Sequence, residues 1–139
     1  MRILILCTGN SCRSQMAAGF LRSFNAGFEV YSGGTKPSSR TNPNAIKVMR
    51  ELGIDISNSV PRNVDEYVDL DLDYVITVCD HAKEVCPVFQ GAVKNRLHIG
   101  FDDPLDAVGT PEEILSEYRR VRDEIKRDFT ALYQDKLSH

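Results

Sequence analysis

The chain has 139 residues, of which 42% are hydrophobic and 27% charged, and its formal net charge is -3 at pH 7. This length predicts a single domain, residues 1–139, that buries a core without disulfide staples. The negative net charge argues against a nucleic-acid-binding protein, and no apolar run approaches the roughly 20 residues that cross a membrane. Because the apolar run at the N-terminus ends at Leu6, it does not resemble a signal peptide. We therefore expect a cytoplasmic protein whose thiols stay reduced.

The first half of the chain alternates between strand and helix patterns. A continuous apolar run from Ile3 to Leu6 is typical of a strand buried on both faces. From Arg13 to Phe24 apolar residues recur at intervals of three and four, which predicts an amphipathic helix, and Asn25–Gly27 ends it. Phe28–Ser32 is predicted as a second strand, followed by a turn at Gly33 and Gly34.

The second half continues this alternation. A helix is predicted from Pro43 to its C-cap Gly53, and a shorter one from Val64 to Leu70. Asp73–Val78 and Arg96–Ile99 are predicted strands, and a long amphipathic helix is expected from Pro111 to Leu132. Alternating strands and helices indicate an α/β fold, with a four-stranded parallel sheet in three layers and helices on both faces.

Two of the four cysteines follow predicted strands directly. Cys7 comes after the first strand and Cys79 after the third. In parallel sheets, ligands bind outside the carboxyl ends of the strands. We therefore expect Cys7 and Cys79 to lie at the same functional edge of the sheet.

The stretch CTGNSCR, residues 7–13, has the composition of an anion-binding loop. Between a strand and a helix, such a loop turns backbone N–H groups inward, where the helix N-terminus adds positive charge. Gly9 permits tight curvature, Asn10 suits a left-handed turn, and Arg13 supplies a planar two-pronged donor for an oxyanion. The same surroundings are expected to lower the pKa of the Cys7 thiol and so to populate the nucleophilic thiolate.

The candidate oxyanion-binding residues follow the nucleophile directly; they are Thr8, Gly9, Asn10, Ser11, Cys12, Arg13 and Ser14. Among them, Ser14 is placed to donate its hydroxyl to the Cys7 thiolate. Cys12 either packs beneath the loop or is an oxidation-sensitive neighbour. A nucleotide P-loop is excluded because the Gly-Lys-[Ser/Thr] ending is missing, and the dinucleotide G-x-G-x-x-G pattern is missing too.

Residues 7–14, CTGNSCRS, resemble the signature of the low-molecular-weight protein tyrosine phosphatase fold. The longer stretch CTGNSCRSQMA resembles the thioredoxin-coupled arsenate reductases built on that fold. The resemblance continues through GIDIS, VITVC, the Cys-Pro pair at 86–87, GFDDP and RRVRDEI, and so covers nearly the whole chain. It implies reduction of arsenate to arsenite, in arsenical detoxification, with no organic cofactor because thiols carry the electrons.

The resemblance also implies a catalytic set, consisting of Cys7, Arg13, Cys79, Cys86 and Asp103. Cys7 attacks arsenic while Asp103 protonates the leaving hydroxyl, and Asp102 is expected to be structural. Cys79 then attacks Cys7, and Cys86 attacks Cys79. A thioredoxin-type protein, or a glutaredoxin-type carrier, reduces the final disulfide. We expect a monomer.

Three other interpretations of the sequence fit it less well. A phosphatase acting on phosphate monoesters uses the same loop and Asp103, but it has no use for Cys79 and Cys86, and Leu105 stands where such phosphatases tend to carry an aromatic residue. A binding or redox-sensing module without catalysis leaves Asp103 without a role. A zinc site is disfavoured because the cysteine spacings form no pair of knuckles.

A subset of these reductases has a potassium site near the loop, and this chain departs from its pattern. Asn10 and Ser32 match, whereas Ala18, Val60 and Arg62 occupy the other positions. We therefore expect no metal here, and we hypothesise that the Arg62 guanidinium supplies the positive charge. The alternative is that Arg62 is a solvated surface residue.

Overall fold

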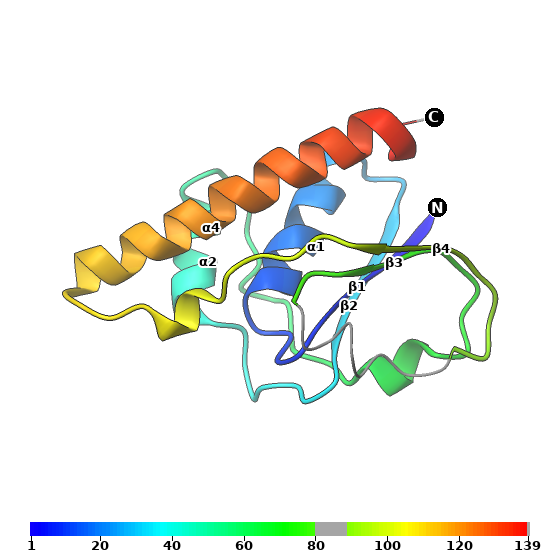
Figure 1. The fold of residues 1–139 in the computed structure, drawn as a ribbon, viewed down its shortest axis with the longest axis horizontal. Coiled ribbons are helices and arrows are strands. Elements are labelled where there is room, and N and C mark those ends of the chain that lie inside the picture. Colours follow the sequence, from blue (N-terminus) through cyan, green and yellow to red (C-terminus); the bar gives the residue numbers. More distant parts are fainter. Residues whose placement is uncertain (80–88, 139) are drawn as a thin grey trace.

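The computed structural model describes residues 1–79 and 89–138, which contain a four-stranded parallel sheet (Figure 1). The strands are β1 (Arg2–Cys7), β2 (Glu29–Gly34), β3 (Leu72–Thr77) and β4 (Val93–His98), in the spatial order β2-β1-β3-β4. The first strand lies between two neighbours and is buried from Ile3 to Cys7, as its unbroken apolar run predicts. The predicted parallel sheet of an α/β fold is confirmed.

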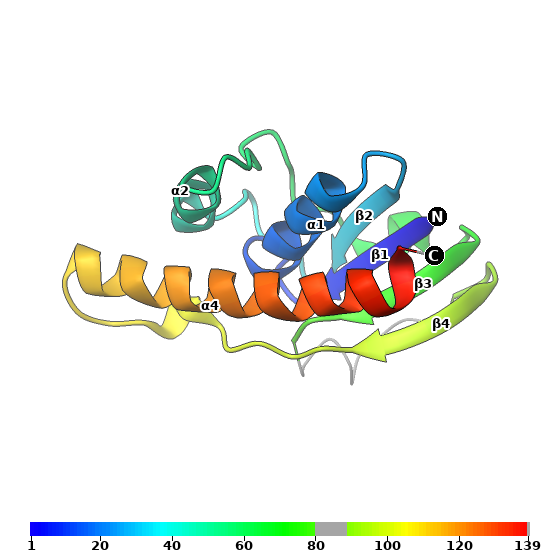
Figure 2. The ribbon, with the colours of Figure 1, turned by 90° about the horizontal axis from the view of Figure 1, so that it is seen from above.

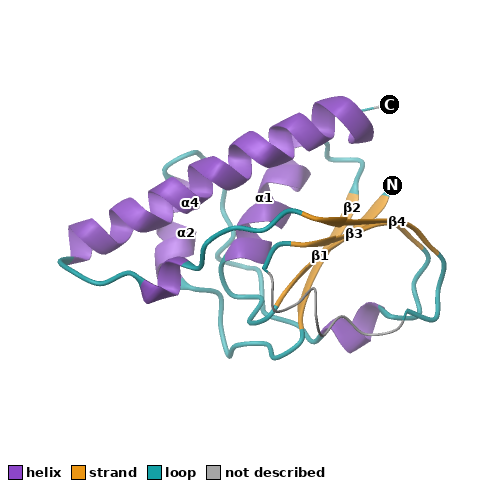
Figure 3. Ribbon diagram, viewed as in Figure 1, coloured by secondary structure: helices purple, strands orange, loops and turns teal. Residues whose placement is uncertain are grey.

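Helices flank this sheet in layers. They are α1 (Arg13–Phe24), α2 (Pro43–Arg50), α4 (Pro111–Leu132), the short η1 (Val64–Tyr67) and η2 (Pro104–Asp106), and a terminal π-turn η3 (Tyr133–Leu137). Helices α1 and α4 lie on one side of the sheet and η1 on the other (Figures 1 and 2). Figure 3, which is coloured by secondary structure, shows the same arrangement of helices around the strands. Among the described helices, none has both the length and the apolar content needed to span a membrane.

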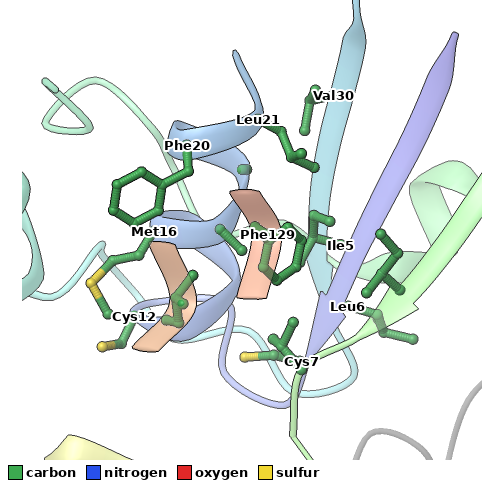
Figure 4. Packing of buried hydrophobic residues seen from close by; sticks show 14 of the residues in the cluster. Ile5, Leu6, Cys7, Cys12, Met16, Phe20, Leu21, Val30 and Phe129 are labelled. Carbon is green, nitrogen blue, oxygen red and sulfur yellow. The ribbon is translucent and has the colours of Figure 1, made fainter. Parts of the chain in front are cut away.

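The core forms where α1 and α4 meet the sheet. In Figure 4, Phe129 of α4 lies between α1 and the strands, close to Ile5 of β1. Both side chains are fully buried, and burial of side chains of this size stabilises a fold by about 1.5–3 kcal/mol each. Thr110 and Glu113 form a capping box at the N-terminus of α4. This box fixes the residue at which the amphipathic helix begins. This packing fixes the start of α1 relative to the end of β1.

Several predicted boundaries need correction. Gly33 and Gly34 do not form a turn: they continue β2 and pair with Leu6 and Cys7 of β1. Glycine is needed at position 34 because a Cβ atom there would lie 2.5 Å from the carbonyl oxygen of Thr8. The helix predicted from Val64 to Leu70 is only the four-residue 3₁₀ helix η1.

The predicted role of Gly53 is confirmed. Its φ of 77° lies in the left-handed region. Its N–H donates to the carbonyl of Arg50, and the N–H of Ile54 donates to that of Met49, at 2.9 and 3.1 Å. These two bonds are the Schellman pattern that terminates many helices at a glycine.

Candidate active site

The loop between β1 and α1 is held from outside by residues 35–42. Four carbonyl oxygens of the loop accept main-chain N–H bonds from this segment: Cys7 from Thr35 at 3.3 Å, Thr8 from Lys36 at 2.9 Å, Gly9 from Ser38 at 2.8 Å and Ser11 from Asn42 at 2.7 Å. The carbonyls therefore face outward, while the N–H of Asn10 is directed at the Cys7 sulfur. This is the backbone arrangement of an anion cradle. The supporting segment was not anticipated from the sequence, because its contribution is made by main-chain groups.

The N-terminus of α1 adds to this cradle. Cys12 occupies the N-cap position, and its side chain makes no capping hydrogen bond. The first turn of the helix also carries no acidic residue. Helix N–H groups that lack capping partners, together with the positive end of the helix dipole, favour a bound anion.

Asn10 holds the loop in its curved form. It is fully buried and has φ 51°, the one positive φ of a non-glycine residue in the part of the chain described. Its Nδ2 donates to the Ser14 hydroxyl at 2.7 Å, and its Oδ1 accepts from the N–H of Arg62 at 2.9 Å and from Nε2 of Gln15 at 3.3 Å. The left-handed turn predicted for Asn10 is therefore confirmed, and it rests on buried polar contacts that compensate for its strain.

The Cys7 thiol has a higher pKa than the sequence suggested. It is buried at the end of β1, and its hydrogen bond with the Cys79 thiol is the main cause of the raised pKa, followed by burial. The Ser14 hydroxyl and the Asn10 N–H act in the opposite direction. The predicted lowering of this pKa is wrong, because Cys79 and burial outweigh these two donors. The predicted Ser14–Cys7 contact is present.

Cys79 lies beside Cys7, as the shared sheet edge predicts. The two thiols share a hydrogen bond, and Cys79 Sγ is also 3.3 Å from the Thr8 hydroxyl. The contact arises because Leu6 pairs with Thr77 in the parallel register of β1 and β3. Cys86, the third predicted thiol, lies outside the described residues.

Arg13, which is predicted to bind the oxyanion, contacts Asp103, the predicted general acid. Arg13 Nη2 lies 3.3 Å from Asp103 Oδ2, and Arg13 Nη1 donates to the Phe101 carbonyl at 3.0 Å. Asp103 Oδ1 accepts from the Leu105 N–H at 3.0 Å and so begins η2. By contrast, Asp102 is 78% exposed and pairs with Arg120 at 3.3 Å. This contact fits the structural role predicted for Asp102.

A cavity of about 210 Å³ opens over the loop. Its lining consists of Cys7, Thr8, Gly9, Ser11, Cys12, Arg13, Ser38, Asp103 and Leu105. Ser38 and Leu105 were not among the predicted site residues. Leu105 is 56% exposed and brings an aliphatic group to the mouth of the cavity. The lining combines a nucleophile, a cation and a carboxylic acid around a space suited to a small oxyanion.

Cys12 is the second thiol at this end of α1 (Figure 4). It is buried, and its pKa is raised to about 12, chiefly by burial and then by the negative charge of Asp103, with Arg13 acting in the opposite direction. A thiol with so high a pKa is protonated at neutral pH and is a weak nucleophile. This environment favours the packing role for Cys12 over the oxidation-sensitive one.

The residues around Asn10 do not fit a potassium ion. A hard cation needs several oxygen ligands. Asn10 Oδ1 already accepts two hydrogen bonds, Ala18 is fully buried with no oxygen in its side chain, and Arg62 is itself a cation. Among the described residues, no group of three His, Cys, Asp or Glu side chains could hold a metal.

Comparison with known proteins places this arrangement in a family. Residues 2–138 match the family described as low molecular weight phosphotyrosine protein phosphatase. The chain belongs to that family. Its relatives include proteins named arsenate reductase from Halalkalibacterium halodurans and Bacillus subtilis, each 48% identical over 124 residues, which are 88% of this chain and 88% of each relative.

Solved structures of this phosphatase family have the same fold. One is described as an arsenate reductase in the phosphate binding state; it is 32% identical, has a TM-score of 0.75, and the match covers 96% of both chains. An arsenate reductase in the oxidized state has a TM-score of 0.76 at 30% identity, with 96% of both chains covered. A tyrosine phosphatase from T. tengcongensis has a TM-score of 0.79 at 25% identity, covering 96% of this chain and 98% of that one. The predicted resemblance is confirmed.

Proposed function

We propose that this protein reduces arsenate to arsenite with its own thiols, as part of arsenical detoxification. The observation that carries the proposal is the contact between Cys7 and Cys79 beneath the loop that would hold the oxyanion. A second thiol beside the nucleophile has no part in ester hydrolysis, whereas reduction needs one. The relatives named arsenate reductase support the same conclusion.

The first step joins Cys7 to arsenic. Arsenate lies in the loop of residues 7–13, where the N–H groups of the loop and the Arg13 guanidinium stabilise its negative charge. The Cys7 thiolate attacks arsenic, the arsenic–oxygen bond of one hydroxyl breaks, and Asp103 donates the proton that lets this group leave as water. The proton of the Cys7 thiol passes to an oxygen of the arsenate dianion, and the Ser14 hydroxyl and the Asn10 N–H, which donate to the Cys7 sulfur, stabilise the thiolate.

The second step transfers two electrons. The Cys79 thiolate attacks Cys7 Sγ, a sulfur–sulfur bond forms, and the electron pair of the sulfur–arsenic bond moves to arsenic, which leaves as arsenite. The Thr8 hydroxyl, 3.3 Å from Cys79 Sγ, can donate to the attacking thiolate. Cys86 then attacks Cys79, releases the Cys7 thiolate and leaves a Cys79–Cys86 disulfide.

An external dithiol completes the cycle. We propose that a thioredoxin-type protein donates the two electrons that reduce the Cys79–Cys86 disulfide, and that the protein acts as a monomer in the cytoplasm, where thiols stay reduced. No metal or organic cofactor is required for these steps. Phosphate and sulfate, which have the same shape as arsenate, are expected to occupy the loop as mimics.

Hydrolysis of phosphate monoesters is the competing function. The loop, Arg13 and Asp103 would serve it equally well, and solved relatives include a tyrosine phosphatase. The mouth of the cavity favours reduction, because Leu105 offers no aromatic face to a phenyl ring. A thioredoxin-coupled assay that follows consumption of reducing equivalents tests the choice. Arsenate should support steady turnover that Cys79→Ser abolishes, and turnover of an aryl phosphate alone would contradict the proposal.

A further inference from the structure

A second cavity is lined in part by Gln15 and Arg62, both of which donate hydrogen bonds to Asn10. Its volume is about 230 Å³, and its polar lining includes Gln15, Arg22, Ser32 and Arg62. It shares no lining residue with the cavity over the loop. The proposed mechanism makes no use of it.

Gln15 leaves one oxygen atom without a partner in this region. Its side chain is buried, with 1% of the residue exposed. Nε2 donates to the Asn10 carbonyl at 3.0 Å and to Asn10 Oδ1 at 3.3 Å, and both of these atoms are acceptors. The amide therefore cannot be flipped, and its other end must accept a hydrogen bond. Oε1 has no such partner within the described ranges, a costly condition for a buried oxygen that only a donor relieves.

Arg62 is a donor that belongs to the same hydrogen-bond network and lines the same cavity. Its main-chain N–H donates to Asn10 Oδ1 at 2.9 Å, the oxygen atom that also accepts from Gln15 Nε2. Asn10 Oδ1 thus joins the Gln15 amide to the backbone of Arg62. A guanidinium carries five N–H donors and its charge persists at any working pH.

The present partner of Arg62 holds it weakly. Nη1 lies 3.3 Å from Glu66 Oε1, and the two side chains are 55% and 49% exposed. Exposed ion pairs of this kind contribute little to stability. Arg22, the other guanidinium at the cavity, is already engaged: its Nη2 donates to the Val30 carbonyl at 2.7 Å, and burial lowers its pKa.

We propose that Arg62 is a positioning residue of the anion loop, whose guanidinium turns from Glu66 into the cavity and donates to Gln15 Oε1 when an oxyanion fills the loop. The inference rests on oxyanion binding by residues 7–13, which is part of the proposed function. Gln15 transmits the contact to Asn10, and Asn10 transmits it to Ser14 and Cys7. The charge of Arg62 behind the loop also attracts the oxyanion in front of it, without any diffusible cation.

Phosphate binding to the full-length protein, measured by calorimetry, tests this role independently of reductase chemistry. Arg62→Met keeps the length of the side chain and removes its donors, and we expect phosphate to bind about tenfold more weakly. Millimolar guanidinium chloride, far below denaturing concentrations, should restore affinity to this variant and leave the wild type unchanged. Arg62→Lys, which keeps a charged donor, should retain most of the affinity.

Arg50→Met is the matched control, because Arg50 forms a comparable exposed pair with Asp55 at 3.9 Å and does not line the cavity. It should bind phosphate as the wild type does. Should Arg62→Met not fold, Glu66→Gln decides: release of Arg62 should tighten phosphate binding about twofold, and unchanged or weaker binding overturns the proposal.

Wild-type affinity in an Arg62→Met variant that folds, or potassium-dependent tightening in the wild type, would also overturn it. Phosphate binding that is absent from the wild type contradicts the oxyanion loop itself, and with it this inference.

Discussion

The Arg13 guanidinium and the Asp103 carboxylate are joined by an ion pair, 3.3 Å between Nη2 and Oδ2, across the mouth of the active-site cavity. The group that should bind the oxyanion is therefore neutralised by the group that should protonate its leaving oxygen. An incoming arsenate competes with Asp103 for Arg13. Once released from Arg13, the Asp103 carboxylate can take up a proton and pass it to the leaving hydroxyl, which would couple oxyanion binding to proton donation.

Asp103→Asn separates these two roles. The amide cannot donate the proton as an acid, so kcat for arsenate should fall by about 10²–10⁴-fold. Arg13 loses a competing anion, so the Kd for phosphate should fall by about threefold. Stopped-flow reduction assays and calorimetry measure the two effects. Asp102→Asn, at an exposed position outside the cavity, is the control and should change neither value.

Thr8→Val should slow the second step and spare the first. The variant loses the hydroxyl 3.3 Å from Cys79 Sγ and keeps the shape of the side chain. Arsenite release in a single turnover should slow by about tenfold, the value of one hydrogen bond to a charged group. Rapid-quench analysis separates formation of the Cys7 adduct from arsenite release. Thr8→Ser restores a hydroxyl and should recover the rate, whereas an equal loss in both steps would argue for a general defect in the loop.

Cys86→Ser should stop the enzyme after about one turnover, because no thiol remains to resolve the first disulfide. Peptide mass mapping of the stalled protein should find Cys7 joined to Cys79. Addition of thioredoxin should not restart the reaction at the wild-type rate. Continued cycling would remove Cys86 from the relay.

Cys12→Ala should change how stability depends on pH. The folded-state pKa of Cys12, about 12, lies above that of an unfolded thiol. Above pH 9 the unfolded chain therefore loses this proton first, and the free energy of unfolding falls as the pH rises. Without Cys12, the decline between pH 8 and pH 10 should be smaller by about 1.4 kcal/mol. Urea unfolding under reducing conditions measures it, and parallel curves for both proteins would contradict the assignment.

Much of the fold could be predicted from local patterns. The run from Ile3 to Leu6, the helix from Arg13 to Phe24 and the helix from Pro111 to Leu132 are confirmed nearly to the residue. Each is encoded by neighbours in sequence. The error at Gly33 and Gly34 is of another kind, because glycine there serves a close approach to Thr8 and not a turn. A glycine pair alone does not distinguish the two uses.

The candidate site also has features that local sequence determines and features that depend on the tertiary structure. The sequence by itself determined that a cysteine ends the first strand, that a glycine, an asparagine and an arginine follow it, and that the loop opens a helix. The tertiary structure decided that Cys7 contacts Cys79, that Arg13 meets Asp103 from 90 positions away, and that the pKa of Cys7 is raised. Spacing along the chain sets backbone conformation, whereas contact distance and burial, which govern thiol chemistry, exist only after the strands have paired.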